Sequence, residues 1–333
     1  MPGMTTATGE GPPADAGFMQ IPVIDMAPLA DGSAALRRKL AEALCEACER
    51  VGFLYLANHG VPDRLIAAMF EAAAAFFALP QEEKMKLRLG RQTAFRGFLP
   101  AGVDGGTAGG NRKEAFQIGP ERLPERRGGR AMELWRPNPW PAMLPGFRTT
   151  LLSYYNAMEA LSDRLLRLVA IGLGVPEDTF VQHYREPIGM LRLLHYPPQD
   201  PDDAVIGSRP HSDGTAVTIL AQDDAGGLEA LGDRGEWTRV TPIAGTLVIN
   251  LGQTMKLWSD GRLAATPHRV INGSGRNRIS IPFFSYPDFD TVIEPVIAAT
   301  RRAKDSEIFG HIARGRPTTT GEIVLGSWAE LYG

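Results

Sequence analysis

From Gly189 onward, the chain is a series of short apolar segments that each end in Gly, Asp, Asn or Pro. The segments are rich in Val, Ile, Leu, Thr and Phe, and they follow one another at close, regular spacing. This spacing indicates an all-β sandwich or barrel, because βαβ units would place a helical pattern between successive strands. The segments predicted as strands are MLRLLHYPP, AVTILAQD, GLEALG, WTRVTP, GTLVINLG, MKLWSDG, TPHRVING and RISIPFFSYP.

The chain before this point is mostly helical in its pattern. Apolar residues at helical spacing predict one helix that starts at Ser33, a capping residue, and ends at Gly52, and a longer helix over 145–172. IPVID, which starts at Ile21, is predicted as a short strand. By contrast, 88–141 is rich in Gly, Arg and Pro and shows little periodicity, so it is interpreted as loop.

Three regions are expected along the chain. Residues 1–17 are small, polar and rich in Pro and Gly, and we predict a disordered tail because so few apolar side chains cannot offset the entropy of ordering. Residues 18–180 are predicted to form a helical region that packs on a β domain of residues 181–333. Together these two regions are expected to form one compact unit, so the predicted fold class is mixed α and β.

The composition favours a small-molecule partner. A formal net charge of -3 and a pI of about 6.1 give no global field for nucleic acid or for an anionic membrane. The first twenty residues do not resemble a secretory signal, and no run approaches the roughly 18 apolar residues of a membrane span. Cys45 and Cys48 lie about one turn apart in a predicted helix, where core packing is expected. We therefore expect a reduced, cytoplasmic protein, with its oligomeric state left open.

A histidine and a carboxylate stand two positions apart in RPHSDGTAVTIL. On a strand, this spacing turns His211 and Asp213 to one face, so that both side chains can reach one point. A second imidazole, His268 in ATPHRVIN, comes from another predicted strand. Two histidines and one carboxylate form the facial ligand set of non-haem Fe(II) oxygenases, which leaves positions open on the metal for a cosubstrate and dioxygen. These three residues are the predicted metal ligands and catalytic centre.

A guanidinium and a hydroxyl form a second pair at the same spacing in RISIPFF. Arg278 and Ser280 suit a carboxylate, because Arg binds it bidentately and stays charged. In LRLLHYPP, Tyr196 and Arg192 share strand parity and could face the same cavity. Arg192 has two interpretations, a structural salt bridge or a contact to cosubstrate or substrate, because a buried Arg needs a partner either way.

Together these motifs resemble the 2-oxoglutarate- and Fe(II)-dependent oxygenases of the isopenicillin N synthase-like type. The resemblance covers nearly the whole chain and rests on IPVID, GFLYLANHGVP, ALPQEEKMKL, LRLLHYPP, HSD followed by QDDAGGLEAL, W-x-x-V-x-P, NLGQTMKLWSDG, HRV and RISIPFF. It implies a distorted double-stranded β-helix, or jelly roll, flanked by N-terminal helices. Iron would be held by His211, Asp213 and His268, and the C5 carboxylate of 2-oxoglutarate would bind Arg278 and Ser280.

The resemblance also implies that Tyr196 lies near the cosubstrate, and two departures from the family pattern bear on its pose. The Asn of the family's N-Y-Y-P run is Leu194 here, so that polar contact is lost or moved to Arg192. The family's G-D pair reads Gly252-Gln253. Neither departure touches the metal ligands or the Arg/Ser pair, so activity is expected to survive.

Five aromatic residues are core by default, but FRGF and the segment after RIS lie where the family builds its substrate pocket. These candidate substrate-lining residues are Phe95, Phe98, Phe116, Phe284 and Tyr286.

The resemblance implies iron-centred oxidation of a small molecule in specialised metabolism, with Fe(II), 2-oxoglutarate and O2 as cofactor and cosubstrates and with succinate and CO2 released. Hydroxylation is the default outcome, and desaturation or ring closure would follow if the substrate radical is held away from the hydroxyl. Three alternatives stay open. They are an isopenicillin N synthase-like iron oxidase that does not use 2-oxoglutarate, an ethylene-forming fragmentation of 2-oxoglutarate, and a metal-free jelly-roll binding module.

Overall fold

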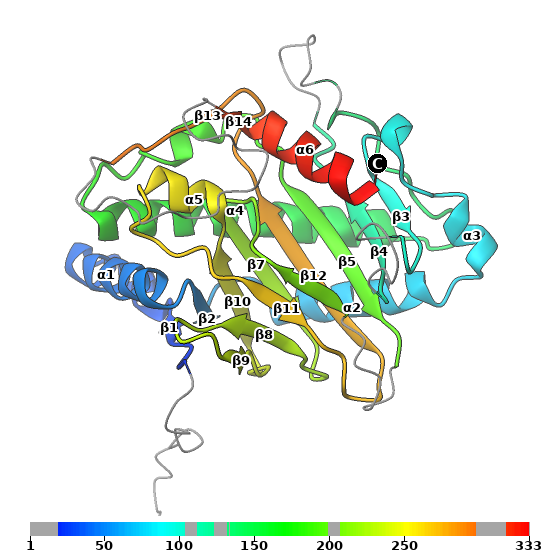
Figure 1. Ribbon diagram of the computed structural model, residues 1–333, viewed down its shortest axis with the longest axis horizontal. Helices are drawn as coiled ribbons and strands as arrows, with labels where there is room; N and C mark the ends of the chain where they lie inside the picture. The colour runs from blue at the N-terminus through cyan, green and yellow to red at the C-terminus, as the bar shows by residue number, and fades with distance from the viewer. Residues whose placement is uncertain are drawn as a thin grey trace, which may run out of the picture.

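The computed structural model describes residues 19–103, 112–122, 132, 134–198, 207–297 and 318–332. Two β-sheets face each other within this part of the chain (Figure 1). The larger has the strand order β1 (Val23–Asp25), β2 (Phe53–Ala57), β10 (Thr246–Leu251), β7 (Val217–Gln222), β12 (Arg278–Ser285), β5 (Met190–Tyr196), β4 (Glu114–Ile118) and β3 (Gly97–Leu99). The smaller has the order β6 (Ser208–His211), β11 (His268–Val270), β8 (Leu228–Leu231) and β9 (Trp237–Arg239), and β13 (Val292–Ile293) pairs with β14 (Thr318–Thr319). The resulting double-stranded β-helix confirms the predicted fold class.

Helices cover the face of the large sheet that points away from the small sheet (Figure 1). The longest is α4, and α1 and α2 both pack against it. The helix α1 begins after Ser33, whose side chain accepts a hydrogen bond from the amide of Leu36, as the capping pattern predicted. The helices are α1 (Ala34–Arg50), α2 (Asp63–Phe77), α3 (Gln81–Met85), α4 (Phe147–Leu173), α5 (Gln253–Trp258) and α6 (Thr320–Tyr332). Short 3-10 turns occur at Ala27–Asp31, Arg91–Thr93 and Val181–His183.

The alternation of side chains along β12 separates a hydrophobic core from the interior between the sheets. Ile281 and Phe283 point to the helices and belong to the large cluster that α1, α2 and α4 complete. Arg278 and Ser280 have the opposite parity and face the space between the two sheets. The fold therefore buries polar groups on the inner face of a sheet whose outer face is sealed by helices. Cys45 and Cys48 are free and buried in the helical core, so core packing is confirmed for both.

Two predictions about secondary structure were wrong. MKLWSDG is not a strand, because its first residues belong to α5, which starts directly after Gly252 at the end of β10. The segment interpreted as loop contains β3 and β4, which extend the large sheet beyond β5. Both strands are short, so neither shows enough alternation to be recognised. The predicted tail, residues 1–17, lies outside the described residues.

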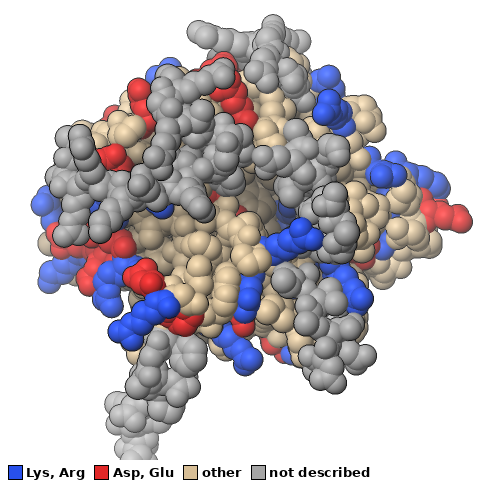
Figure 2. Space-filling view, in the orientation of Figure 1, with Lys and Arg blue, Asp and Glu red and all other residues tan. Residues whose placement is uncertain are grey.

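Within the described part of the chain, no helix is both long and apolar enough to cross a bilayer. On the face seen in Figure 2, Lys and Arg side chains are interspersed with Asp and Glu around a central hollow.

Candidate active site

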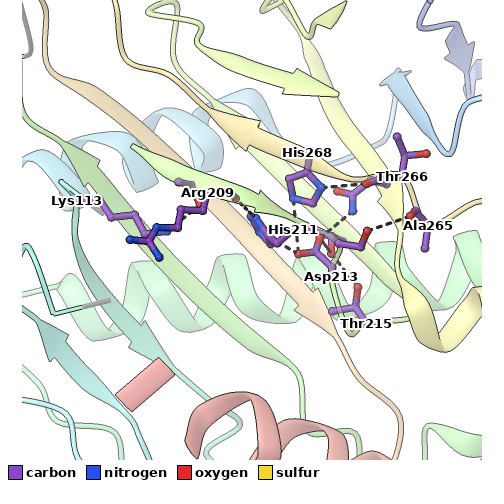
Figure 3. A network of polar contacts seen from close by, with 12 residues as sticks. Lys113, Arg209, His211, Asp213, Thr215, Ala265, Thr266 and His268 are labelled. Carbon is purple, nitrogen blue, oxygen red and sulfur yellow. Dashed lines mark hydrogen bonds and ion pairs between the residues drawn. The ribbon is translucent and has the colours of Figure 1, made fainter. Parts of the chain in front are cut away.

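The three predicted metal ligands meet beside the end of β6 and the start of β11 in the small sheet (Figure 3). His211 is the last residue of β6 and pairs directly with His268, the first residue of β11. The strand ends at His211, so Asp213 lies beyond it, and the prediction that strand parity aligns this pair was wrong. Asp213 is held instead by its backbone carbonyl, which accepts a hydrogen bond of 2.8 Å from the amide of Gln253 at the start of α5.

The ligand atoms form a small triangle. Oδ1 of Asp213 lies 3.8 Å from Nε2 of His211 and 3.8 Å from Nε2 of His268. One donor atom from each residue lies within 4.8 Å of the other two, and the imidazole centroids are 4.4 Å apart. A metal ion with ligand distances of about 2.0–2.2 Å fits among donors at this separation. Nitrogen and oxygen donors on one face suit Fe(II) and leave other coordination positions open.

Hydrogen bonds on the far side of each ligand fix its orientation. Nδ1 of His211 lies 2.7 Å from the carbonyl of Arg209, and Nδ1 of His268 lies 3.3 Å from the carbonyl of Thr266. An Nδ1–H that donates to these carbonyls leaves the Nε2 lone pairs for a metal.

The carboxylate of Asp213 is anchored in the same way. Its Oδ2 accepts hydrogen bonds from Nδ2 of Asn250 at 2.8 Å and from Oγ1 of Thr218 at 2.7 Å. These contacts direct Oδ1 to the imidazoles. The site is therefore organised by the protein itself.

The electrostatics of the site favour the metal-binding protonation states. Burial alone would raise the pKa of Asp213, but the two imidazoles and the hydrogen bonds from Asn250 and Thr218 outweigh it and lower this pKa. Desolvation within the site, followed by the proximity of His268, lowers the pKa of His211 below its ordinary value. The aspartate is thus ionised and the imidazole of His211 neutral near pH 7, as metal ligands must be.

A buried cation lies farther along the inner face. Arg278 is 1% exposed, its Nε donates to the carbonyl of Gly226 at 2.6 Å, and its Nη1 donates to Oγ of Ser280 at 2.9 Å. Its Cζ lies 4.7 Å from the ring centroid of Tyr196. Among the described residues, no carboxylate lies within ion-pair distance of Arg278. A guanidinium buried without a counter-ion calls for an anionic ligand, and a dicarboxylate such as 2-oxoglutarate supplies one.

Comparison with known proteins identifies the family. Residues 21–143 match the model described as the non-haem dioxygenase in morphine synthesis N-terminal, and residues 176–287 match the 2OG-Fe(II) oxygenase superfamily. The 2-oxoglutarate-Fe(II) type oxidoreductase hxnY of Emericella nidulans is 34% identical over 325 residues, which cover 94% of this chain and 90% of that protein. The chain belongs to the 2-oxoglutarate- and Fe(II)-dependent oxygenases.

Other members of this family support the same assignment. Homoarginine-6-hydroxylase 2-ODD-233 of Oryza sativa is 33% identical, with 92% of this chain and 96% of that protein covered. A full-length protein of Neurospora crassa, crystallised in complex with alpha-KG, superposes with a TM-score of 0.80 and 27% identity, over 93% of this chain and 96% of that one. This oxygenase therefore uses Fe(II), 2-oxoglutarate and O2, and it is a dioxygenase as predicted.

Two of the predicted pocket aromatics do not reach the active site of this oxygenase. Phe98 and Phe116 are fully buried on the helical side of the large sheet, and each packs against Phe76 of α2. Their strand parity turns them away from the interior between the sheets, so both pack in the core, and the prediction that they line the substrate pocket was wrong.

The other three predicted aromatics do lie on the inner side. Phe95 borders a recess next to β4 and β5. Tyr286 belongs to the inner cluster, and Phe284 packs against that cluster and lies 5.6 Å, ring centroid to Cζ, from Arg192. Arg192, the residue with two interpretations, is buried, and its Nε donates to Oε1 of Gln117 at 2.9 Å.

Four polar residues near the metal ligands and Arg192 were not predicted from the sequence as part of the site. Thr218 and Asn250 anchor Asp213, and Gln117 holds Arg192. Lys113 is buried beside β6 and donates to Oγ of Ser208 at 3.2 Å. A polar residue within an otherwise apolar strand, as in TLVINLG or AVTIL, can indicate a functional site. Burying such a residue costs free energy unless it has a hydrogen-bond partner. Gln117 and Lys113 lie in or beside β4, which was not recognised as a strand.

Proposed function

We propose that this oxygenase holds Fe(II) with His211, Asp213 and His268, binds the C5 carboxylate of 2-oxoglutarate with Arg278 and Ser280, and hydroxylates a small-molecule substrate. The observation that carries the cosubstrate assignment is Arg278, a fully buried cation without a carboxylate partner among the described residues. Its planar fork can bind both oxygens of a carboxylate while the Ser280 hydroxyl adds a third donor.

Each residue of the site has a defined part in this reaction. Bound iron would supply the oxidising chemistry, in which 2-oxoglutarate is cleaved to succinate and CO2 as O2 is consumed. Asp213 and the two histidines would hold the metal and leave coordination positions for the cosubstrate and O2. Arg278 fixes the far end of the cosubstrate, and the ring of Tyr196 shields that charge pair from water.

We further propose that the substrate belongs to specialised metabolism and that the enzyme acts in the cytoplasm. Support for the substrate comes from the range of relatives, which include gibberellin 20 oxidase 2 of Oryza sativa and the oxidoreductase ppzC of Metarhizium majus. Support for the compartment comes from two buried cysteines that are both free.

The test is anaerobic addition of Fe(II) and then 2-oxoglutarate, followed by visible spectroscopy for the charge-transfer band of a chelated 2-oxo acid. We expect a band in the wild type, no band in His211→Ala, and a band for Arg278→Ala only at much higher 2-oxoglutarate concentration. Arg148→Ala, which removes a guanidinium from an outer ion pair with Glu121, should behave as wild type.

Two other outcomes would overturn the proposal. Iron binding without a band would favour an oxidase that does not use 2-oxoglutarate, and lack of iron binding would leave the three ligands without a metal. With a substrate in hand, succinate formed in equal amount to oxidised product separates hydroxylation from fragmentation of 2-oxoglutarate.

A further inference from the structure

The C-terminal helix α6 starts at a defined place on the fold. Thr319 and Glu322 form a capping box, in which Oγ1 of Thr319 accepts a hydrogen bond from the amide of Glu322 and the carboxylate of Glu322 accepts one from the amide of Thr319. The amide of Gly321 donates to the carbonyl of Phe289 at 2.9 Å, and a Cβ at Gly321 would overlap the Phe289 ring. The start of α6 is thus fixed against the segment that follows β12, and this determines where its next residues lie.

Ile323, in the first turn of α6, packs against the loop that carries the metal ligand Asp213. Ile323 is 1% exposed and belongs to the large hydrophobic core. A Cβ built at Gly214, the residue after Asp213, would lie 3.3 Å from Cγ2 of Ile323. This separation is shorter than the roughly 3.5–4.0 Å of an ordinary contact between carbon atoms. The methyl group on Cβ of Ile323 therefore occupies the space that a side chain at position 214 would need.

The glycine at position 214 serves this contact and not an unusual backbone conformation. Gly214 has no positive φ, so the position does not use the conformational freedom of glycine. A Cβ at Gly214 would lie 3.6 Å from the hydroxyl oxygen of Tyr286, which is an ordinary contact, and its closest neighbour would be Ile323. The absence of a side chain at Gly214 is therefore what lets α6 approach the metal-ligand loop.

Two helices hold this loop by different interactions. From α5, Oγ1 of Thr254 donates to the carbonyl of Gly214 at 2.7 Å, and the amide of Gln253 donates to the carbonyl of Asp213 at 2.8 Å. From α6, the loop receives the apolar contact of Ile323. The hydrogen bonds fix two carbonyl oxygens, whereas the apolar contact restricts the backbone at the residue next to the ligand.

We propose that Ile323 is a positioning residue of the metal site, which acts through Gly214 to hold the Asp213 loop in place. The triangle of ligands contains no residue of α6, so this helix contributes to metal binding by restricting the loop. Without the Cγ2 contact the loop is freer to move away from the two imidazoles, and reassembling the triangle then costs part of the free energy of Fe(II) binding. The inference rests on the proposed function, because Asp213 is a ligand of that same site.

Two conservative changes at Ile323 separate positioning from general stability. Ile323→Val keeps Cγ2 and loses only Cδ1, whereas Ile323→Leu keeps the number of carbon atoms but has no methyl group on Cβ. Anaerobic Fe(II) titration measures the affinity, and thermal unfolding of the metal-free protein measures the stability. We expect Ile323→Leu to bind Fe(II) about 3- to 10-fold more weakly and Ile323→Val to stay within about twofold of wild type. Equal losses in the two variants, or no loss in Ile323→Leu, would overturn the proposal.

A double-mutant cycle tests the contact itself. Gly214→Ala should weaken Fe(II) binding about 3- to 10-fold, because its methyl group presses on Ile323 and displaces the loop. Ile323→Ala should weaken binding to a similar extent, because the loop loses its support. In the double variant the added methyl group takes space that the shortened side chain leaves, so the affinity should be closer to wild type than in either single variant. Additive losses would contradict a direct coupling between the two residues.

Ile118 provides the matched control, since it is also 1% exposed and belongs to the same core cluster but lies on β4. Ile118→Leu should lower the melting temperature and leave the Fe(II) affinity unchanged. A loss of affinity equal to that of Ile323→Leu would show that affinity merely follows stability, against the proposal.

These outcomes are distinct from failure of the proposed function. If the wild type binds no Fe(II), the proposed function fails before any variant is compared. If the wild type binds Fe(II) and no variant at Gly214 or Ile323 differs from it, the proposed function stands and the positioning role of Ile323 fails.

Discussion

Oγ1 of Thr218 donates a hydrogen bond of 2.7 Å to Oδ2 of Asp213, so a strand residue of the large sheet orients the one carboxylate among the metal ligands. Thr218→Val keeps the shape of the side chain and removes this donor. We expect iron affinity to fall about 10- to 100-fold, because partners of metal ligands contribute on this scale. Anaerobic Fe(II) titration measures the change. An affinity equal to wild type would mean that Asn250 alone suffices to orient Asp213.

The cosubstrate clamp depends on the shape of the guanidinium as well as on its charge. Arg278→Lys keeps the charge but loses the bidentate fork, and we expect the KM for 2-oxoglutarate to rise by about 10- to 100-fold. Ser280→Ala removes one neutral donor and should raise it by about 3- to 10-fold. Steady-state succinate formation gives both values. Equal effects of the two substitutions would contradict the ranking.

Gly252 has no room for a side chain. A Cβ built there would lie 2.3 Å from the carbonyl oxygen of Thr215 and 2.7 Å from that of Asp213. Gly252→Ala should therefore displace the Asp213 loop, with loss of iron binding before loss of fold. Gly273→Ala is the control, since nothing lies within 4 Å of its Cβ. Circular dichroism and iron titration of both variants test this, and a Gly252→Ala protein with full iron affinity would refute it.

Phe116 and Phe284 lie on strands of the same sheet but face opposite sides, and substitution should distinguish them. Phe116→Ala leaves a hole in the helical core, so we expect a loss of about 3–5 kcal/mol in the free energy of unfolding with little change in substrate KM. Phe284→Ala should lose less stability and raise the substrate KM. Urea unfolding and steady-state kinetics measure the two effects. The assignment of faces would be wrong if both variants showed the same pattern.

Glu114 lies in a buried charge cluster. Its carboxylate contacts Nζ of Lys84 at 2.7 Å and Nδ1 of His195 at 2.8 Å. Burial tends to raise the pKa of Glu114, but the hydrogen bonds and charges of these two partners outweigh it and lower this pKa below its ordinary value. Because the folded-state pKa is lowered, the stabilisation is present above the unfolded-state pKa and is lost as pH falls through the folded-state pKa.

Glu114→Gln should consequently cost about 3 kcal/mol in the free energy of unfolding at pH 7, since it leaves Lys84 buried without its partner. The difference from wild type should shrink at pH values below about 4. Glu83→Gln, which breaks a more exposed pair with Lys86, should cost less than about 1 kcal/mol at any pH. Urea unfolding across pH provides the measurement. A difference independent of pH would show that packing, not charge, is responsible.

The sequence predicted the parts of this molecule that depend on local pattern. The cap at Ser33, the long helix and most strands of the jelly roll followed from periodicity and turn residues, and the three ligand candidates followed from residue type. The prediction failed where contacts distant in sequence decide the structure. Asp213 is positioned through the amide of Gln253, and β4 is a strand chiefly because β5 is there to pair with it. The periodicity within each segment carries no information about partners that are distant in sequence.

The three metal ligands differ in how much of each side chain is exposed to solvent. The side chain of His211 is 44% exposed, whereas those of Asp213 and His268 are 5% and 10% exposed. His211 is therefore the most solvent-accessible of the three ligands, and we expect an ion held by this triangle to exchange on the side of His211. The apoprotein would keep its backbone, and chelation and reloading would be reversible without refolding. A purified preparation should accordingly accept Co(II) or Ni(II) as a spectroscopic substitute by simple dialysis.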